Sequence, residues 1–241
     1  MTLKSQDLLV VLKIAAYGIR SHRSKTRITE VTDTESKRGW TDTEDFQKTL
    51  PLGVSIEEDH IQEKYESTLF FESDIDHSLI KESIISDNWT YRQMAEDLYI
   101  STSEASAATQ RAIKSKLIRI SSESEKPEPI RGNLEEFIIH ATKYIFPPER
   151  GSETRGIPTA YASPLFEKLI VQSNDLPPVW ADPYGTMRGI SISPIYKTVP
   201  KAVKKDVDLY ELLSIVDTFR LGRPREIEIA TYKLLERLNK L

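Results

Sequence analysis

The sequence lacks several residue types and patterns that would commit a protein to a particular chemistry. It has no cysteine, which excludes disulfide bonds and thiolate metal sites. Its four histidines are scattered without metal-ligand spacing, and neither a glycine-rich phosphate loop nor a nucleophile elbow is present. We therefore expect no enzymatic activity, no metal and no cofactor. An enzyme acting through a pocket in the C-terminal half stays open as an alternative.

Long apolar runs are also absent. No stretch approaches the roughly 20 apolar residues that a membrane helix needs, and the N-terminus has no signal-peptide cleavage pattern. We expect a cytoplasmic protein without a membrane partner. Its 241 residues suffice for one large domain or two modest ones.

Proline is scarce in the first half, since twelve of the thirteen prolines lie at residue 127 or beyond. This change predicts two domains, residues 1–130 and residues 131–241, in an α+β and mostly helical fold. In the second domain Asn133 is a candidate N-cap of a helix over 134–145, and 179–192 resembles a β-hairpin around an Asp182-Pro183-Tyr184-Gly185 turn. Two helices that meet at Gly222 and Pro224 end the chain as a helical hairpin.

The N-terminal 18 residues form an amphipathic pattern with a wide apolar face, which predicts a buried helix that Gly18 ends. Residues 89–119 predict two short helices around a tight turn, followed by a basic strand. Thr90 is the candidate N-cap of the first helix, which ends near Tyr99, and the second helix runs over 103–116. Residues 117–120 open a hairpin with its tip at 121–126.

The second of these helices has two different faces. Small residues, among them Ala105, Ala108 and Ala112, recur at three- and four-residue intervals and favour close packing on the first helix. Between residues 105 and 119 there are four cations and no acid, although the whole chain carries a formal charge of -4. Such a local excess of cations favours contact with nucleic acid. Two amphipathic helices around a serine-rich turn also occur as ordinary helical core, which is the alternative interpretation.

Three stretches together resemble the bacterial winged helix-turn-helix transcriptional regulators of the MarR-like kind. They are TLKSQDLLVVLKIA, WTYRQMAEDLYISTSEASAATQRAIKSKLI and GNLEEFIIHATKYIFPPERG, about a third of the chain. The resemblance implies that residues 1–130 are a winged helix-turn-helix domain and that 131–241 dimerise or sense a signal. One departure is Tyr99, where such turns usually carry glycine. Tyr99 either adopts left-handed dihedrals, at a cost of about 1 kcal/mol, or the turn is longer.

The residues that we expect to contact double-stranded DNA lie at the start of the first helix, in the turn, on the polar face of the second helix and at the hairpin tip. They are Thr90, Tyr91, Arg92, Ser101, Thr102, Ser103, Ser106, Gln110, Arg111, Lys114 and Lys126.

An acidic tract separates the N-terminal helix from these residues. Residues 30–87 hold sixteen acids against five lysines and arginines, a net charge of -11. The tract looks like an insertion, with predicted helices over 56–70 and 76–85, and the sequence leaves open whether 6–16 or 76–85 is the first helix of the DNA-binding unit. We expect a solvated elaboration that faces away from DNA; a module for a protein partner and an autoinhibitory flap are the alternatives.

Three guanidinium groups, Arg220, Arg223 and Arg225, cluster between the last two predicted helices. Such a cluster can hold an anion, and internal ion pairing with neighbouring acids is the interpretation that we favour. Taken together, the sequence predicts a homodimeric, sequence-specific DNA-binding repressor. The alternative is an antitoxin or defence-system module that uses the helix-turn-helix as a scaffold for protein interaction.

Overall fold

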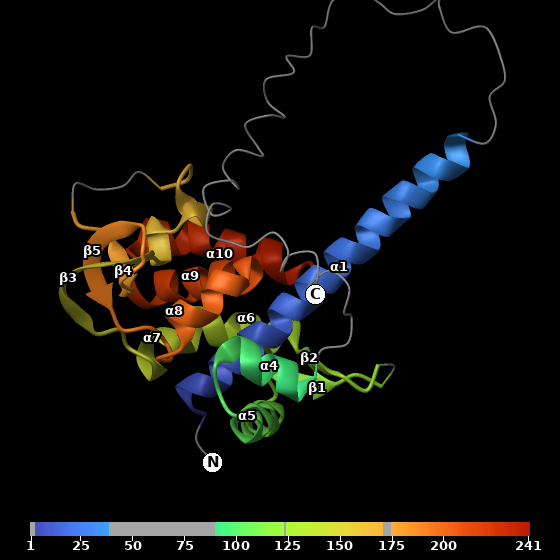
Figure 1. The fold of residues 1–241 in the computed structure, drawn as a ribbon, viewed down its shortest axis with the longest axis horizontal. Helices are drawn as coiled ribbons and strands as arrows, with labels where there is room; N and C mark the ends of the chain where they lie inside the picture. Colours follow the sequence, from blue (N-terminus) through green and yellow to red (C-terminus); the bar gives the residue numbers. More distant parts are fainter. Residues whose placement is uncertain (1–2, 39–89, 123, 171–174) are drawn as a thin grey trace, which may run out of the picture. The chain divides into compact units, whose positions relative to one another are not determined.

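A computed structural model describes residues 3–38, 90–122, 124–170 and 175–241, with the backbone alone from residue 24 to 38 (Figure 1). The described chain is α+β, and helices predominate. The chain divides into two compact units, Met1–Arg23 with Asn88–Leu241, and Ser24–Asp87. The expected boundary at residue 130 therefore does not divide the first unit. The predicted helices over 56–70 and 76–85 lie outside the described residues.

Helix α1 (Ser5–Arg38) is one unbroken helix, so the expected stop at Gly18 is wrong (Figure 1). A Cβ atom at position 18 would lie 2.9 Å from Cδ2 of Leu241, so the end of that leucine side chain would have to shift. The apolar residues between Leu8 and Ile19 are buried.

Two short helices and a two-stranded ribbon follow in the order that the sequence predicts. They are α4 (Tyr91–Leu98), α5 (Thr102–Lys114), β1 (Ile118–Ile120) and β2 (Pro127–Pro129). The strands pair antiparallel, with Ile118 opposite Pro129 and Ile120 opposite Pro127. The predicted hairpin with its tip at 121–126 is confirmed.

The next helix begins earlier than expected. α6 (Arg131–Glu136), a π-helical turn (Phe137–Ala141) and α7 (Thr142–Ile145) follow one another without a break and end before Phe146-Pro147-Pro148. Asn133 was expected to be the N-cap, but Ile130 occupies that position and Asn133 lies inside α6. The Asn133 amide instead donates a hydrogen bond of 2.7 Å to the carbonyl oxygen of Lys116, just after α5.

The expected β-hairpin over 179–192 is wrong. β3 (Arg150–Pro158) pairs antiparallel with both β4 (Pro178–Ala181) and β5 (Met187–Ile192), and β4 and β5 pair parallel to close a small barrel. The predicted turn does form, since the Gly185 amide donates to the Asp182 carbonyl at 3.0 Å. Gly185 then lies directly on Gly156 of β3, where a Cβ would be 2.1 Å from the Gly156 carbonyl carbon. This close crossing carries the chain to the other edge of β3.

The last helices are α8 (Val199–Ala202), α9 (Val207–Leu221) and α10 (Pro224–Leu238). The predicted helical hairpin is confirmed as α9 and α10, with Gly222 at the end of one and Pro224 in the first turn of the other. α9 is buried around most of its circumference and contacts α10, α7 and a 3-10 turn at Ala160–Ala162. It is the central element of the first unit.

Candidate nucleic-acid interface

The turn between α4 and α5 is held by local hydrogen bonds. The Thr90 hydroxyl caps α4 by accepting from the Gln93 amide at 3.1 Å, and the Ser101 hydroxyl caps α5 by accepting from the Glu104 amide at 3.1 Å. Tyr99 has left-handed dihedrals, with φ 54° and ψ 43°, and the following amide of Ile100 donates to the Ala95 carbonyl at 3.0 Å. This is the Schellman arrangement that normally favours glycine. Tyr99 therefore takes the first of the two conformations that its position allowed.

The inner face of α5 is as small as the sequence indicates. Ala105, Ala108 and Ala112 have no exposed surface, and Met94 and Leu98 of α4 are likewise fully buried. Side chains of this size let two helices approach closely without a cavity. The outer face of α5 is thereby turned away from α4.

An exposed row of side chains runs along that outer face. We call it the α5 outer stripe: Ser103, Ala107, Gln110 and Lys114. The spacing of three and four residues places all four on one side of the helix, and the row contains no acid. Ser106 lies beside the stripe and is half-buried, and Thr102 is exposed at the start of the helix. These positions agree with the polar face that the sequence predicts.

Arg111 is the exception, because its side chain points inward to α1. Its Nε donates to the Asp7 carboxylate at 2.8 Å, and its terminal nitrogen also donates to that carboxylate. Asp7 is fully buried, and the Arg111 side chain is 10% exposed. The hydrogen bond that Arg111 donates to Asp7 raises the pKa of Arg111 and keeps it cationic. We therefore leave Arg111 out of the candidate interface.

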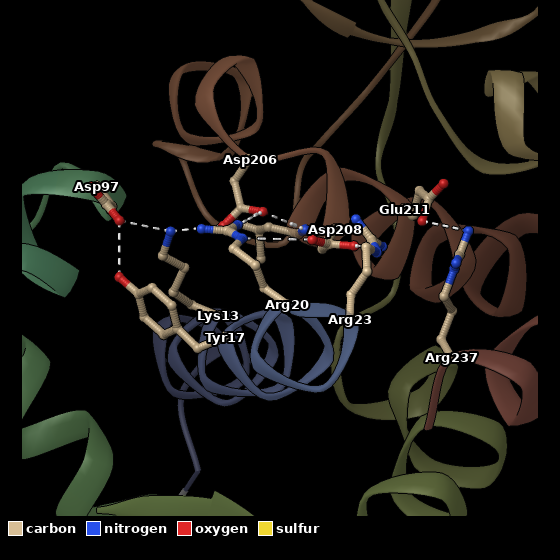
Figure 2. Close-up of polar contacts among 10 residues, drawn as sticks. Lys13, Tyr17, Arg20, Arg23, Asp97, Asp206, Asp208, Glu211 and Arg237 are labelled. Atoms are coloured by element: carbon tan, nitrogen blue, oxygen red, sulfur yellow. Dashed lines mark hydrogen bonds and ion pairs between the residues drawn. The ribbon is translucent and has the colours of Figure 1, made fainter. Parts of the chain in front are cut away.

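A second contact joins α1 to α4. Figure 2 shows Lys13 between two carboxylates, with Nζ 2.7 Å from Asp97 of α4 and 2.7 Å from Asp206, the N-cap of α9. Tyr17 donates a hydrogen bond of 2.9 Å to the same Asp97. Burial disfavours charge on Asp206, but Lys13 and Arg20 outweigh it and lower the pKa of Asp206. Of the two candidate first helices, residues 6–16 thus contact both α4 and α5, whereas 76–85 lie outside the described residues.

The ion pairs around Lys13 are balanced in charge. Arg20 reaches Asp206 at 2.7 Å, Arg23 reaches Asp208 at 2.7 Å, and Arg237 reaches Glu211 at 2.7 Å. The cations and carboxylates of this network are equal in number, so it carries no net formal charge. Its members are Lys13, Arg20, Arg23, Arg237, Asp97, Asp206, Asp208 and Glu211 (Figure 2).

Other cations lie in α4, in the β1–β2 ribbon and next to these elements in the sequence. Arg119 of β1 lies 3.8 Å from Glu128 of β2, and both side chains are exposed. Arg92 is exposed and pairs with Glu96 on its own helix, and Tyr91 is half-buried. Lys116, Arg119 and Arg131 are exposed cations that were not among the expected contact residues. Lys126 is half-buried at the end of the hairpin tip.

The arginine cluster of the C-terminal half divides into two environments. Arg220 is almost fully buried, pairs with Asp217 and donates to the Phe146 carbonyl at 2.7 Å. The internal pairing that we favoured is therefore found for Arg220. Arg223 and Arg225 are exposed.

Within the described ranges, no group of three or more histidine, aspartate or glutamate side chains could hold a metal ion. The same residues include no helix of sufficient length and apolarity to cross a membrane. No family model, curated protein or solved structure matches this chain.

Proposed function

We propose that the protein is a winged helix-turn-helix transcriptional regulator that binds double-stranded DNA, with α5 in the major groove and the β1–β2 ribbon beside it. The observation that carries the proposal is the α5 outer stripe, an acid-free row of side chains on a short helix. The inner face of α5 packs on α4, Ser101 caps the first turn of α5, and a tight turn follows its last residue. A rigidly held helix with one free polar face is what major-groove recognition requires.

The residue types in and around the stripe suit different parts of DNA. Gln110 has the paired donor and acceptor that match the major-groove edge of adenine, and Lys114 can bind a phosphate or a guanine. Ser103 and Thr102 lie in the first turn, where backbone amides also favour a phosphate. Lys116 and Arg119 extend the cationic surface toward the ribbon, and Arg92 and Lys126 would bind phosphates at its borders.

We propose that the protein acts in the cytoplasm as a homodimeric repressor, since a two-fold dimer matches palindromic operators. Leu8, Leu12, Val216 and Leu234 are apolar residues of the terminal helices, and all four are buried within one chain. The dimer must therefore use other residues. In this proposal the acidic residues 30–87 face away from DNA and are available to a protein partner.

The test is a selection of binding sites from a random double-stranded DNA library, followed by fluorescence anisotropy titration of the full chain on the selected site. Gln110→Ala and Lys114→Ala should each weaken binding by about 1–3 kcal/mol if the side chain contacts a base. If Lys114 contacts a phosphate, its loss should also make the slope of log affinity against log salt concentration shallower by about one. Lys168→Ala, which removes an exposed cation elsewhere, is the matched control.

The alternative is a protein-interaction module, such as an antitoxin or a defence-system component. The inward orientation of Arg111 favours it, because the helix loses one of its cations for DNA. The same experiment distinguishes the two functions. Unchanged affinity in both α5 variants, or affinity without salt dependence, would refute DNA binding through α5.

A further inference from the structure

A pocket of about 350 Å³ lies between the small barrel and the junction of the last two helices. It is lined by the start of β3, by the 3-10 turn at Ala160–Ala162, by β5, by the end of α9 and by the start of α10, and all of these belong to the same compact unit. Small-molecule sites range from about 300 to 1,000 Å³, so the volume suits a compact ligand. The lining residues are Arg150, Tyr161, Asp175, Leu176, Ile190, Leu221, Arg223 and Glu226.

Three hydrogen-bond donors converge on this pocket. Arg150 has no carboxylate partner among the residues that the structure describes, and neither its guanidinium nor the Tyr161 hydroxyl is hydrogen-bonded to one of them. Arg223 lies 4.0 Å from Asp175, with both side chains 77% exposed, which is a weak pair. The donors are therefore available to a ligand.

One acid of the pocket, Glu226, is held at the start of α10. Glu226 accepts a hydrogen bond of 2.7 Å from the Arg223 amide and sits in the first turn of α10, where the helix dipole favours a carboxylate. Burial and then the charge of Glu226 raise the pKa of Tyr161, so the tyrosine stays protonated and can donate. No described residue accepts a hydrogen bond from the Arg150 guanidinium or the Tyr161 hydroxyl.

We propose that this pocket binds a small organic monocarboxylate with an apolar body. The carboxylate lies between Arg150, Arg223 and the Tyr161 hydroxyl, and the apolar body contacts Leu176, Ile190 and Leu221. Guanidinium groups bind carboxylates with two parallel hydrogen bonds, so arginine is better suited than lysine to hold a carboxylate.

The charges of the pocket distinguish this ligand from others. Its two arginines and two acids cancel in formal charge, so a bound dianion such as a phosphate monoester would leave more uncompensated negative charge than a monocarboxylate would. A neutral ligand would leave the charge of Arg150 without a partner. The inference concerns the C-terminal half alone and does not depend on DNA binding.

The probe for the test is phenylacetate, titrated into the full chain and followed by isothermal calorimetry. Phenylacetamide, a neutral molecule of the same shape, and phenyl phosphate, a dianion, are the matched ligands. We expect phenylacetate to bind at least tenfold more tightly than either. Arg150→Gln and Tyr161→Phe should each weaken phenylacetate binding at least fivefold, and Arg225→Gln, which changes an exposed arginine outside the pocket lining, should leave it unchanged.

Arg150 and Arg225 are exposed, so their replacement should leave the fold intact. Circular dichroism melts of the variants should therefore match those of the unaltered chain. Equal binding of phenylacetate and phenylacetamide would overturn the proposal, as would tighter binding of phenyl phosphate. No detectable phenylacetate binding at millimolar concentration would overturn it too. Failure here leaves the DNA-binding test unaffected, since that test uses only α5 variants.

Discussion

The contact between Asp7 of α1 and Arg111 of α5 makes a quantitative prediction about stability. The buried Asp7 carboxylate accepts from Arg111 Nε at 2.8 Å and from the Lys4 amide at 2.8 Å. Arg111→Met keeps most of the aliphatic volume but leaves that carboxylate without its cation. Breaking one side of a buried ion pair costs about 3–5 kcal/mol, and we expect about 3 kcal/mol because the Lys4 amide remains.

The assay is a double-mutant cycle in urea, with Asp7→Asn, Arg111→Met and both together. The double variant lacks the unpaired charge that destabilises Arg111→Met, so its loss should fall short of the sum of the single losses by about 2 kcal/mol. Equal slopes with urea in all four proteins would show that the same transition is measured. If the single losses add to within about 0.5 kcal/mol, the two residues are not coupled and our account of this contact is refuted.

Three further predictions concern single positions. The lowered pKa of Asp206 means that its contribution to stability is present above the unfolded pKa of about 3.9 and is lost as pH falls through the lower folded value. Lys13→Met should move this loss to higher pH in acid titrations of unfolding. An unchanged acid midpoint would contradict the network of Figure 2. Tyr99→Gly should raise the free energy of unfolding by up to about 1 kcal/mol, because glycine adopts the left-handed conformation freely, whereas a loss would show that the ring contributes more than its backbone costs. Gly185→Ala should prevent a stable fold, as judged by thermal melting, since its Cβ would overlap β3, and Gly132→Ala, with nothing within 4 Å, should be tolerated as the control.

Local chemistry made α4, α5 and the turn between them predictable from the sequence. The hydroxyl of Thr90 and the small residues of α5 act within a few positions of the chain, where capping and helical spacing apply directly. The same holds for the Asp182–Gly185 turn. The hairpin assigned to that turn was wrong because the pairing of β4 and β5 depends on β3, which lies outside the local pattern.

Charge partners could not be predicted in the same way. Arg111 borders the polar face of α5 by spacing, and only the packed structure brings Asp7, 104 positions earlier, to its side. The pocket likewise joins Arg150, Tyr161 and Arg223 from three separate elements. The arginine cluster drew attention to Arg223, but no linear signal links it to Arg150 or Tyr161.

The bond between Lys13 and Asp206 also sets an order of events during synthesis. These residues are 193 positions apart, so a ribosome adding about 5–20 residues per second needs roughly 10–40 s to make the second after the first. Through that interval Lys13, Arg20 and Arg23 of α1 lack the carboxylates at the start of α9. Helix α1, which contacts α5 through Asp7, therefore reaches its final contacts only after the C-terminal helices are made. An N-terminal fragment released early would expose the buried face of α1 to other chains.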